Sequence, residues 1–228
     1  MIHEHGIGYI QEVNEKGEVV ILARLPNLER AIDRQYNEVE IIFQDGRKIS
    51  PEQRRKVYAL LGEIAEFVDG FRNSETIEDA KNQRKWEFIL QHMEATERKM
   101  FSLADCSMTI AREFISYLIE FIIKNDIPSS VPLLDNCEDI GAYVYACALN
   151  HKCIICGKKA QWHHAEDRVG MGRDRKEICH IGMRGMPLCE EHHELCHTMP
   201  QNEFNEKYHI QSIKVDEKLA KTYRLKKE

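Results

Sequence analysis

The chain has 228 residues, of which 43% are hydrophobic, and a formal net charge of −6. This length allows one good-sized domain or two small ones, and the hydrophobic content is enough to fill a core. No stretch approaches about 18 uninterrupted apolar residues, and the first residues lack the basic and apolar regions of a signal peptide. We therefore expect a cytoplasmic protein without membrane contact, whose eight cysteines are reduced thiols available to metal rather than disulfides.

The N-terminal region is rich in β-forming residues. Residues 6–24 and 37–49 are dominated by valine, isoleucine and aromatic runs. Turn sequences interrupt them at Asn14-Glu15-Lys16-Gly17 and at Asp45-Gly46. Because apolar runs separated by such turns are typical of paired strands, this region predicts two hairpins.

A helix start follows these strands. In Ser50-Pro51-Glu52-Gln53 we expect Ser50 as the N-cap, Pro51 at the first helical position and Gln53 as the partner in a capping box. Apolar residues then recur at helical spacing, which predicts a helix that packs in the core. They are Val57, Leu60, Leu61, Ile64, Ala65 and Val68.

Further helical segments are expected before residue 150. The clearest runs from Ser107 to Lys124 and carries two adjoining apolar rows. These rows contain Ile110, Phe114, Leu118 and Phe121, and Ile115, Ile119 and Ile122. The segment from Gln83 to Lys99 is charged and less clearly amphipathic. Residues Asn136 to Leu149 are expected to form a helix that leads into a cysteine-rich part of the chain.

Cysteine and histidine are concentrated between residues 153 and 197. Cys153-x2-Cys156 and Cys189-x2-His192 are paired ligand units about 30 residues apart, a pattern that closes a tetrahedral structural zinc site. Ordinary reduced thiols would not need these paired spacings. We therefore expect Cys153, Cys156, Cys189 and His192 to hold a structural Zn²⁺.

A second set of candidate ligands contains imidazoles alone. His193 and His197 are spaced i, i+4, so they share one helical face, and His163 can supply a third nitrogen. Three protein ligands with open positions are typical of a catalytic ion, in this case Mg²⁺, Mn²⁺, Ni²⁺ or Zn²⁺. His164, next to His163, is then left as a general base. A second structural zinc site is the alternative.

Three more residues of this block compete as ligands. Cys196 follows His193 at i+3 and points partly off the histidine face, so we expect it to pack in the interior. For His180, a ligand role and a contact with substrate are equally open. Cys179 stays a further candidate ligand.

Positive charge accompanies these ligands. Residues 1–149 carry 17 lysines and arginines against 26 acidic residues, whereas residues 150–228 carry 15 against 12. Both glycines and basic residues occur in the stretch after the histidine pair, which suits close contact with a phosphate chain. The candidate nucleic-acid-binding residues are Arg168, Arg173, Arg175 and Lys176, together with Arg184. A solvated loop balanced by its own acidic residues is the alternative.

The ligand pattern resembles that of the HNH endonucleases, whose ββα-metal fold places a His-His pair on a strand and a His-x3-His pair on the following helix. The resemblance implies that His163 binds the metal, that His164 is the general base and that the helix pair completes the ligand set. Many members also carry a zinc knuckle of two cysteine units. The asparagine that usually stands five positions before the second knuckle unit is replaced by Arg184, which could instead meet a phosphate as a catalytic contact.

The N-terminal half resembles, more weakly, the NinB-type recombination mediators of bacteriophages. The likeness covers residues from about 35 to 130 and rests on the helix start Ile49–Leu61 and on Ser107-Met108-Thr109. It implies single-stranded DNA binding and dimer formation; a domain that only supports the nuclease is the alternative. With Val169-Gly170-Met171-Gly172-Arg173 included, most of the chain resembles phage HNH nucleases of the HNHc nuclease family.

Together these features predict an α+β protein. We expect a mixed N-terminal domain over residues 1–148, a zinc-stabilised, treble-clef-like HNH nuclease domain over 149–212 and a charged tail over 213–228. The predicted activity is metal-dependent hydrolysis of DNA, single-stranded or branched forms included, in phage recombination or processing within the host cytoplasm, with a homodimer as candidate assembly. A non-catalytic zinc-containing nucleic-acid-binding or recombination-mediator module and an RNA-directed nuclease or toxin are the alternatives.

Overall fold

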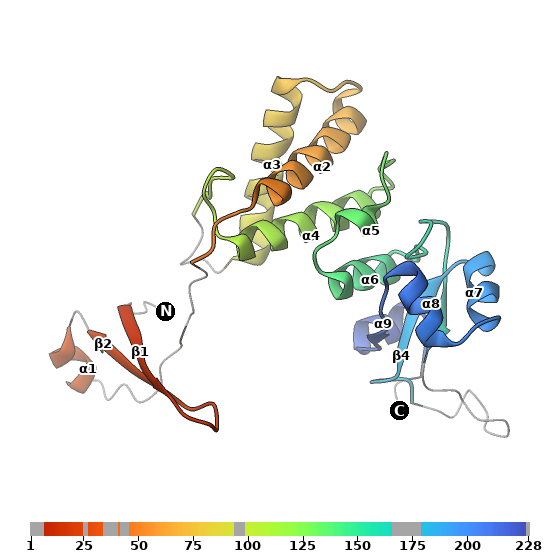
Figure 1. Cartoon of the computed structure of the whole chain (residues 1–228). Coiled ribbons are helices and arrows are strands. Elements are labelled where there is room, and N and C mark those ends of the chain that lie inside the picture. Colours follow the sequence, from red (N-terminus) through yellow and green to blue (C-terminus); the bar gives the residue numbers. More distant parts are fainter. Residues whose placement is uncertain are drawn as a thin grey trace. The chain divides into compact units, whose positions relative to one another are not determined.

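The computed structural model of the chain describes residues 7–24, 27–33, 41, 46–93, 99–165 and 179–226. The chain divides into two compact units, Met1–Gln44 and Asp45–Glu228 (Figure 1). This division differs from the predicted boundary near residue 148, because one continuous hydrophobic core extends from Ile49 to Ile210. None of the helices in the described ranges combines the length and apolar character needed to cross a bilayer.

The first unit contains an antiparallel hairpin of β1 (Ile7–Val13) and β2 (Val19–Arg24). Asn14 closes the turn, since its side-chain oxygen accepts hydrogen bonds from two backbone N–H groups of the loop at 3.0 and 2.9 Å. Gly17 supplies the left-handed conformation of the turn, with φ 79°. The first predicted hairpin is therefore confirmed, whereas the second, over 37–49, lies mostly outside the described residues.

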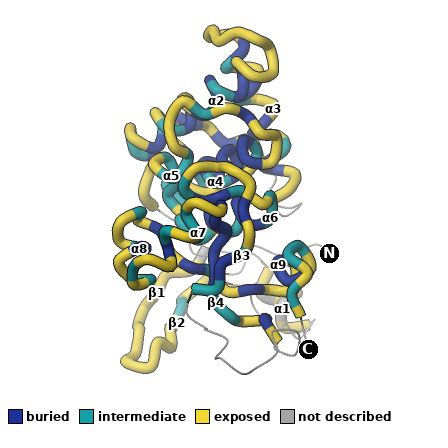
Figure 2. Tube along the Cα trace, turned by 90° about the vertical axis from the view of Figure 1, so that its right-hand side faces the viewer, coloured by how far each residue is buried: buried dark blue, intermediate teal, exposed yellow. Residues whose placement is uncertain are grey.

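Most apolar side chains of this hairpin are exposed. Tyr9 and Leu22 are register partners, and they are 72% and 58% exposed. Figure 2 shows the same exposure along β1 and β2. The short helix α1 (Leu28–Asp33) follows and is not indicated by the sequence patterns.

The second unit begins with α2 (Pro51–Asp69). The Ser50 side chain accepts a hydrogen bond from the backbone N–H of Gln53, and the Gln53 side chain accepts one from the Ser50 N–H, at 3.0 and 3.1 Å. The predicted capping box is therefore confirmed. The predicted apolar stripe is buried as far as Ala65, but the prediction is wrong for Val68, which is 64% exposed in the last turn of the helix.

Helix α3 (Ser74–His92) starts well before Gln83, where the charged segment was expected. Its N-terminus is fixed by a capping box whose N-cap is Asn73. The helix buries cations among its core positions, and the Arg84 guanidinium lies 4.0 Å from the centroid of the Phe121 ring. Because cations over aromatic rings replace some of the usual apolar contacts, the helix has a weak amphipathic pattern.

Helix α4 (Met108–Lys124) matches its prediction, with Ser107 as the N-cap. It packs against α2 and α3, and an aromatic cluster joins it to α3. The Phe114 ring centroid lies 5.4 Å from those of both Phe88 and Phe101, and these rings meet edge to face. This cluster forms the centre of the helical part of the core.

The helix expected from Asn136 to Leu149 is split in two. A short α5 (Leu133–Asn136) precedes α6 (Ile140–Leu149), and Asp139 caps α6 by accepting a hydrogen bond from a backbone N–H at 2.9 Å. The Tyr143 hydroxyl donates to the Ile154 carbonyl at 2.9 Å. Helix α6 packs against α4, and this bond ties it to the loop that carries the first cysteine unit.

The candidate ligands lie in the last part of this unit. Strands β3 (Gln161–His164), β4 (Arg184–Leu188) and β5 (Ile213–Lys214) form an antiparallel sheet in the order β3-β4-β5. Helix α7 (Glu190–His197) follows β4 after one residue, and α8 (Gln201–Tyr208) comes next. The strand pair and the helix after it therefore carry both predicted histidine pairs.

Residues 213–226 differ from the predicted charged tail, because they are folded onto the rest of this unit. Helix α9 (Glu217–Thr222) buries Leu219 completely, in a small cluster with Ala148 of α6. Although the segment carries many charged side chains, it also contains the apolar residues that make this contact. The backbone N–H of His180 also donates to the Lys226 carbonyl at 2.9 Å, which ties the C-terminal segment to the loop before β4.

Candidate functional site

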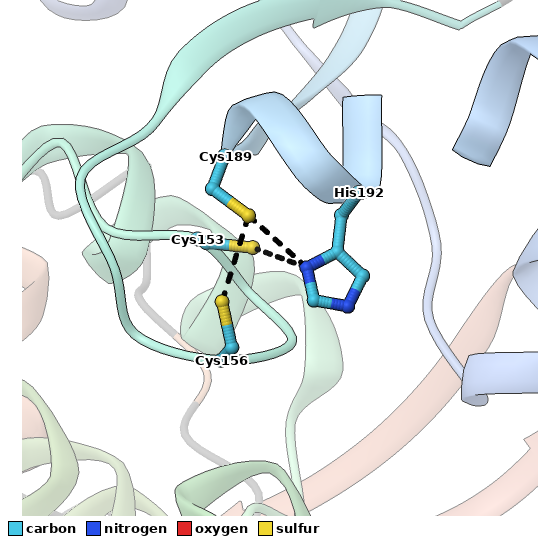
Figure 3. A group of neighbouring side chains, drawn as sticks. All are labelled: Cys153, Cys156, Cys189 and His192. Carbon is cyan, nitrogen blue, oxygen red and sulfur yellow. Dashed lines mark hydrogen bonds between the residues drawn. The ribbon is translucent and has the colours of Figure 1, made fainter. Parts of the chain in front are cut away.

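The two cysteine units come together around one point. Cys153 and Cys156 lie in a tight turn, in which the Gly157 N–H donates to the Cys153 carbonyl at 2.8 Å. Cys189 is the N-cap of α7, and His192 lies in its first turn. The Sγ atoms of Cys153 and Cys189 lie 3.6 and 3.1 Å from His192 Nδ1, and Cys156 Sγ lies 3.6 Å from Cys189 Sγ (Figure 3).

These separations fit a single tetrahedral ion. Thiolates about 2.3 Å from Zn²⁺ would lie about 3.8 Å apart at the tetrahedral angle. Burial and the neighbouring thiols of Cys189 and Cys153 raise the pKa of Cys156 to about 12. Crowded thiols of this kind keep their protons unless a cation stabilises the thiolates. The donor chemistry and spacing of this Cys3His group therefore suit a zinc ion.

The three predicted imidazole ligands form a separate group. His163 comes from β3, and His193 and His197 come from successive turns of α7. The ring centroid of His163 lies 4.8 Å from that of His193 and 5.2 Å from that of His197. One ligand atom from each residue lies within 4.8 Å of the others. His163 is buried and His197 exposed, so the group is open to solvent on one side.

Burial keeps two of these imidazoles, His163 and His193, in the form that binds metal. It lowers the pKa of His163 to about 4, and the nearby His193 and His197 add to the effect. Burial also lowers the pKa of His193. Both rings are therefore neutral near pH 7, and a neutral ring nitrogen can donate its lone pair to a divalent ion.

His164 follows His163 on β3. Its ring centroid is 5.2 Å from that of His180, whose ring is buried. The sequence leaves two roles open for His180, a metal ligand and a contact with substrate. Among the described residues, His180 belongs to neither group of candidate ligands. His180 instead contacts the residue predicted as the general base.

Strand β4 places Arg184 and Gly185 beside the histidine pair. The guanidinium of Arg184 donates to the Ser212 hydroxyl from Nε at 3.0 Å and to the Ser212 carbonyl from Nη2 at 2.7 Å. Arg184 therefore joins β4 to the segment before β5, and its contact with phosphate stays a prediction. A side chain at Gly185 would collide with the His163 carbonyl and the Trp162 ring, so only glycine allows the strands to approach this closely.

Two further residues, Cys196 and Gln201, lie against His163. Cys196 is 4% exposed, as expected of a packing residue, and its Sγ lies 3.4 Å from His163 Nε2. Gln201 Oε1 lies 3.1 Å from the same nitrogen. Sequence patterns gave no indication of Gln201, because it belongs to α8 and reaches the histidine only through the fold.

The predicted phosphate-binding loop lies outside the described residues. It contains Arg168, Arg173, Arg175 and Lys176. Their contact with nucleic acid therefore stays a prediction. Cys179, which follows this loop, is exposed and belongs to neither of the candidate ligand groups found in the described part of the chain.

A second basic surface lies at the start of α2. A hollow of about 430 Å³ is lined there by Pro51, Arg54, Arg55, Tyr58, Ala59 and Arg72. Arg54 is anchored by hydrogen bonds to the carbonyls of Leu103 and Ala104 at 2.9 and 2.7 Å. No acidic side chain is among these lining residues. Three guanidinium groups that line one hollow are suited to binding anions.

The fold and the two groups of ligands define a class of protein: an α+β chain with a Cys3His site and an open imidazole site. Residues 26–227 match the model of a family described as "Putative HNHc nuclease". Because the match covers most of the chain, the chain belongs to this HNHc nuclease family, as its motifs predict. Comparisons with curated proteins and with solved structures gave no match. The family implies a nucleic-acid substrate, and HNH nucleases use divalent metal ions.

Proposed function

We propose that this protein is a metal-dependent endonuclease that hydrolyses phosphodiester bonds in DNA during phage recombination or DNA processing. The observation that carries the proposal is the group of His163, His193 and His197, with one ligand atom from each within 4.8 Å of the others. Three imidazoles leave coordination positions open, as a catalytic ion requires. A binding module would need only the closed Cys3His site.

The Cys3His group has a positioning role in this mechanism. Cys189 and His192 belong to the start of α7, while Cys153 and Cys156 belong to the loop after α6. A zinc ion shared by the two segments would fix the direction in which α7 presents its histidines to β3. The unit would be a zinc-stabilised ββα-metal site of the treble-clef kind.

His164 is the proposed general base. A divalent ion held by the three histidines would supply positive charge for the scissile phosphate and the departing 3′ oxygen. The His164 imidazole accepts a proton from the attacking water, whose oxygen bonds to phosphorus while the bond to the 3′ oxygen breaks. The departing 3′ oxygen takes a proton from solvent, so the products carry a 5′ phosphate and a 3′ hydroxyl. Because the base must start unprotonated, cleavage should fall on acidification.

The direct test is a cleavage assay with the full chain and its His164→Ala variant. Supercoiled, linear, single-stranded and branched DNA, and an RNA of matched sequence, would each be incubated with Mg²⁺, Mn²⁺, Ni²⁺ or Zn²⁺. A positioned base contributes about 10²–10⁴-fold, so the variant should lose most cleavage and keep DNA affinity and zinc content. His209→Asn is the matched control, because His209 is exposed and its left-handed backbone suits asparagine.

Wild-type rates in His164→Ala would remove His164 from the mechanism. Cleavage of RNA but not of DNA would indicate an RNA-directed nuclease instead. No cleavage of any substrate with any ion would favour the non-catalytic nucleic-acid-binding module instead.

We also propose that the arginine-lined hollow at α2 binds the nucleic-acid backbone, which would give the N-terminal part its DNA-binding role. The support is the convergence of Arg54, Arg55 and Arg72 beside Tyr58.

For each phosphate that a protein no longer neutralises, the slope of log affinity against log salt becomes shallower by about one unit. Arg55→Gln with Arg72→Gln should therefore weaken DNA binding on every sequence and flatten this slope, while Arg112→Gln, exposed on α4, should not. An unchanged slope would contradict this role of the hollow.

A further inference from the structure

The two ring nitrogens of His163 lie in different surroundings. Nε2 lies 3.1 Å from Gln201 Oε1 and 3.4 Å from Cys196 Sγ. Nδ1 is buried and has no hydrogen-bond partner within the described part of the chain. One nitrogen of this ring is therefore held by the protein, and the other is left for a ligand.

The orientation of the Gln201 amide decides which nitrogen of His163 carries the hydrogen. Gln201 Nε2 donates to Asn205 Oδ1 at 2.9 Å, one turn further along α8. This bond turns Oε1 towards His163, and a carbonyl oxygen can only accept. The Cys196 thiol also donates to the same oxygen at 3.5 Å. His163 Nε2 must then be the N–H donor, and Nδ1 keeps the lone pair.

We propose that Gln201 is a positioning residue that fixes the tautomer of His163, so that Nδ1 is the atom that binds a divalent ion. This inference rests on the proposed function, in which His163 is a ligand. Ligand histidines commonly donate their second ring N–H to an oxygen outside the coordination set, and removal of that oxygen weakens metal binding about 10–100-fold. Asn205 holds the amide of Gln201 in the required orientation.

The position of Gln201 in the chain makes this contact specific to the fold. His193, His197 and Gln201 follow one another at intervals of four residues. Helix α7 nevertheless ends at His197, and α8 begins at Gln201 after Pro200. Gln201 therefore approaches His163 from a separate helix, and its side chain acts on the strand ligand rather than on the helix pair.

Gln201→Leu and Gln201→Glu separate a positioning role from simple packing. Leucine fills similar space but cannot accept a hydrogen bond, whereas glutamate keeps the accepting oxygen. Ni²⁺ affinity of the zinc-loaded full chain would be measured by titration calorimetry. Gln201→Leu should weaken Ni²⁺ binding about 10–100-fold, and Gln201→Glu should bind at least as tightly as the unaltered chain. Asn202→Leu, an exposed neighbour on α8, is the matched control and should bind normally.

Nitrogen-15 NMR of the zinc-loaded chain without Ni²⁺ reads the tautomer directly. We expect the hydrogen of His163 on Nε2 in the unaltered chain and a mixture of tautomers in Gln201→Leu with an unchanged melting profile. Unaltered Ni²⁺ affinity in Gln201→Leu, equal weakening in both variants or a hydrogen on Nδ1 would overturn the inference. A chain that shows the expected tautomer and Ni²⁺ response but cuts no nucleic acid would refute the nuclease proposal alone.

Discussion

At the scale of single residues, the Cys3His group depends on all four of its donors. A tetrahedral ion has four ligands, so the loss of any one of them leaves its coordination incomplete. The thiols of Cys153, Cys156 and Cys189 converge with His192 from two separate segments. Loss of one donor would open the coordination of the ion and leave the remaining three crowded together. The same segments carry α7, so the imidazole site depends on this group indirectly.

Replacing Cys189 by serine should therefore remove zinc and loosen the part of the chain around α7. Structural zinc contributes an apparent 10–16 kcal/mol or so to the folding of zinc-finger peptides, so the effect on the melting profile should be large. Zinc content and thermal unfolding of Cys189→Ser are the measurements. Cys179→Ser is the control, since Cys179 is exposed and outside both ligand groups. Normal zinc content in Cys189→Ser would contradict the assignment of the Cys3His group as a zinc site.

His197 gives the matching test of the imidazole group. It is the exposed member of the three, so alanine at this position should be tolerated by the fold. His197→Ala should bind the exchangeable ion more weakly and lose cleavage, yet keep its zinc and its melting temperature. If the variant cuts DNA at the normal rate in limiting metal, His197 is not a ligand, and Cys196, whose Sγ lies 3.4 Å from His163 Nε2, becomes the better candidate.

At the scale of secondary structure, local signals and tertiary contacts account for different parts of the molecule. The start of α2 could be predicted because a capping box involves only Ser50 and Gln53. The apolar face of α3 could not, because its buried Arg84 looks like a surface residue until Phe121 covers it. The folding of the C-terminal segment could not be predicted for a related reason, since Leu219 finds its partners on α6.

The candidate site divides in the same way. Both ligand groups could be predicted, because x2 and i, i+4 spacings fix which side chains face the same point within one turn or helix. Gln201, Ser212 and His180 could not, because each meets a site residue only after β3, β4 and α8 have packed. Contacts between residues that are distant in the sequence produce no periodic pattern that a single sequence could reveal.

Helix α9 offers a direct test that residues 213–226 belong to the folded unit. Leu219 is fully buried, so Leu219→Ala should destabilise the chain by about 2–5 kcal/mol, because a buried cavity replaces the side chain. Urea unfolding followed by circular dichroism measures the shift in midpoint. Leu90→Ala is the control, because Leu90 is 55% exposed and its replacement should cost about 0.5 kcal/mol or less. An equal, small shift in both variants would mean that α9 is not packed.

At the scale of the whole molecule, charge is divided between the two parts of the sequence. The excess of acidic residues lies in residues 1–149, whereas the basic excess accompanies the ligands in residues 150–228. A net charge of −6 would repel a polyanion, so binding must rely on local clusters of cations. DNA affinity should consequently fall steeply with added salt.

Metal content and cleavage, measured on the same preparation, test the central claim most directly. The chain would be treated with a mild chelator, its retained zinc counted by mass spectrometry and its activity on DNA assayed before and after divalent ions are restored. We predict that one zinc ion per chain resists the chelator, that cleavage is lost with a second, exchangeable ion, and that adding a divalent ion restores it. Two zinc ions that both resist chelation, in a chain that cuts no DNA under any condition, would contradict a catalytic imidazole site.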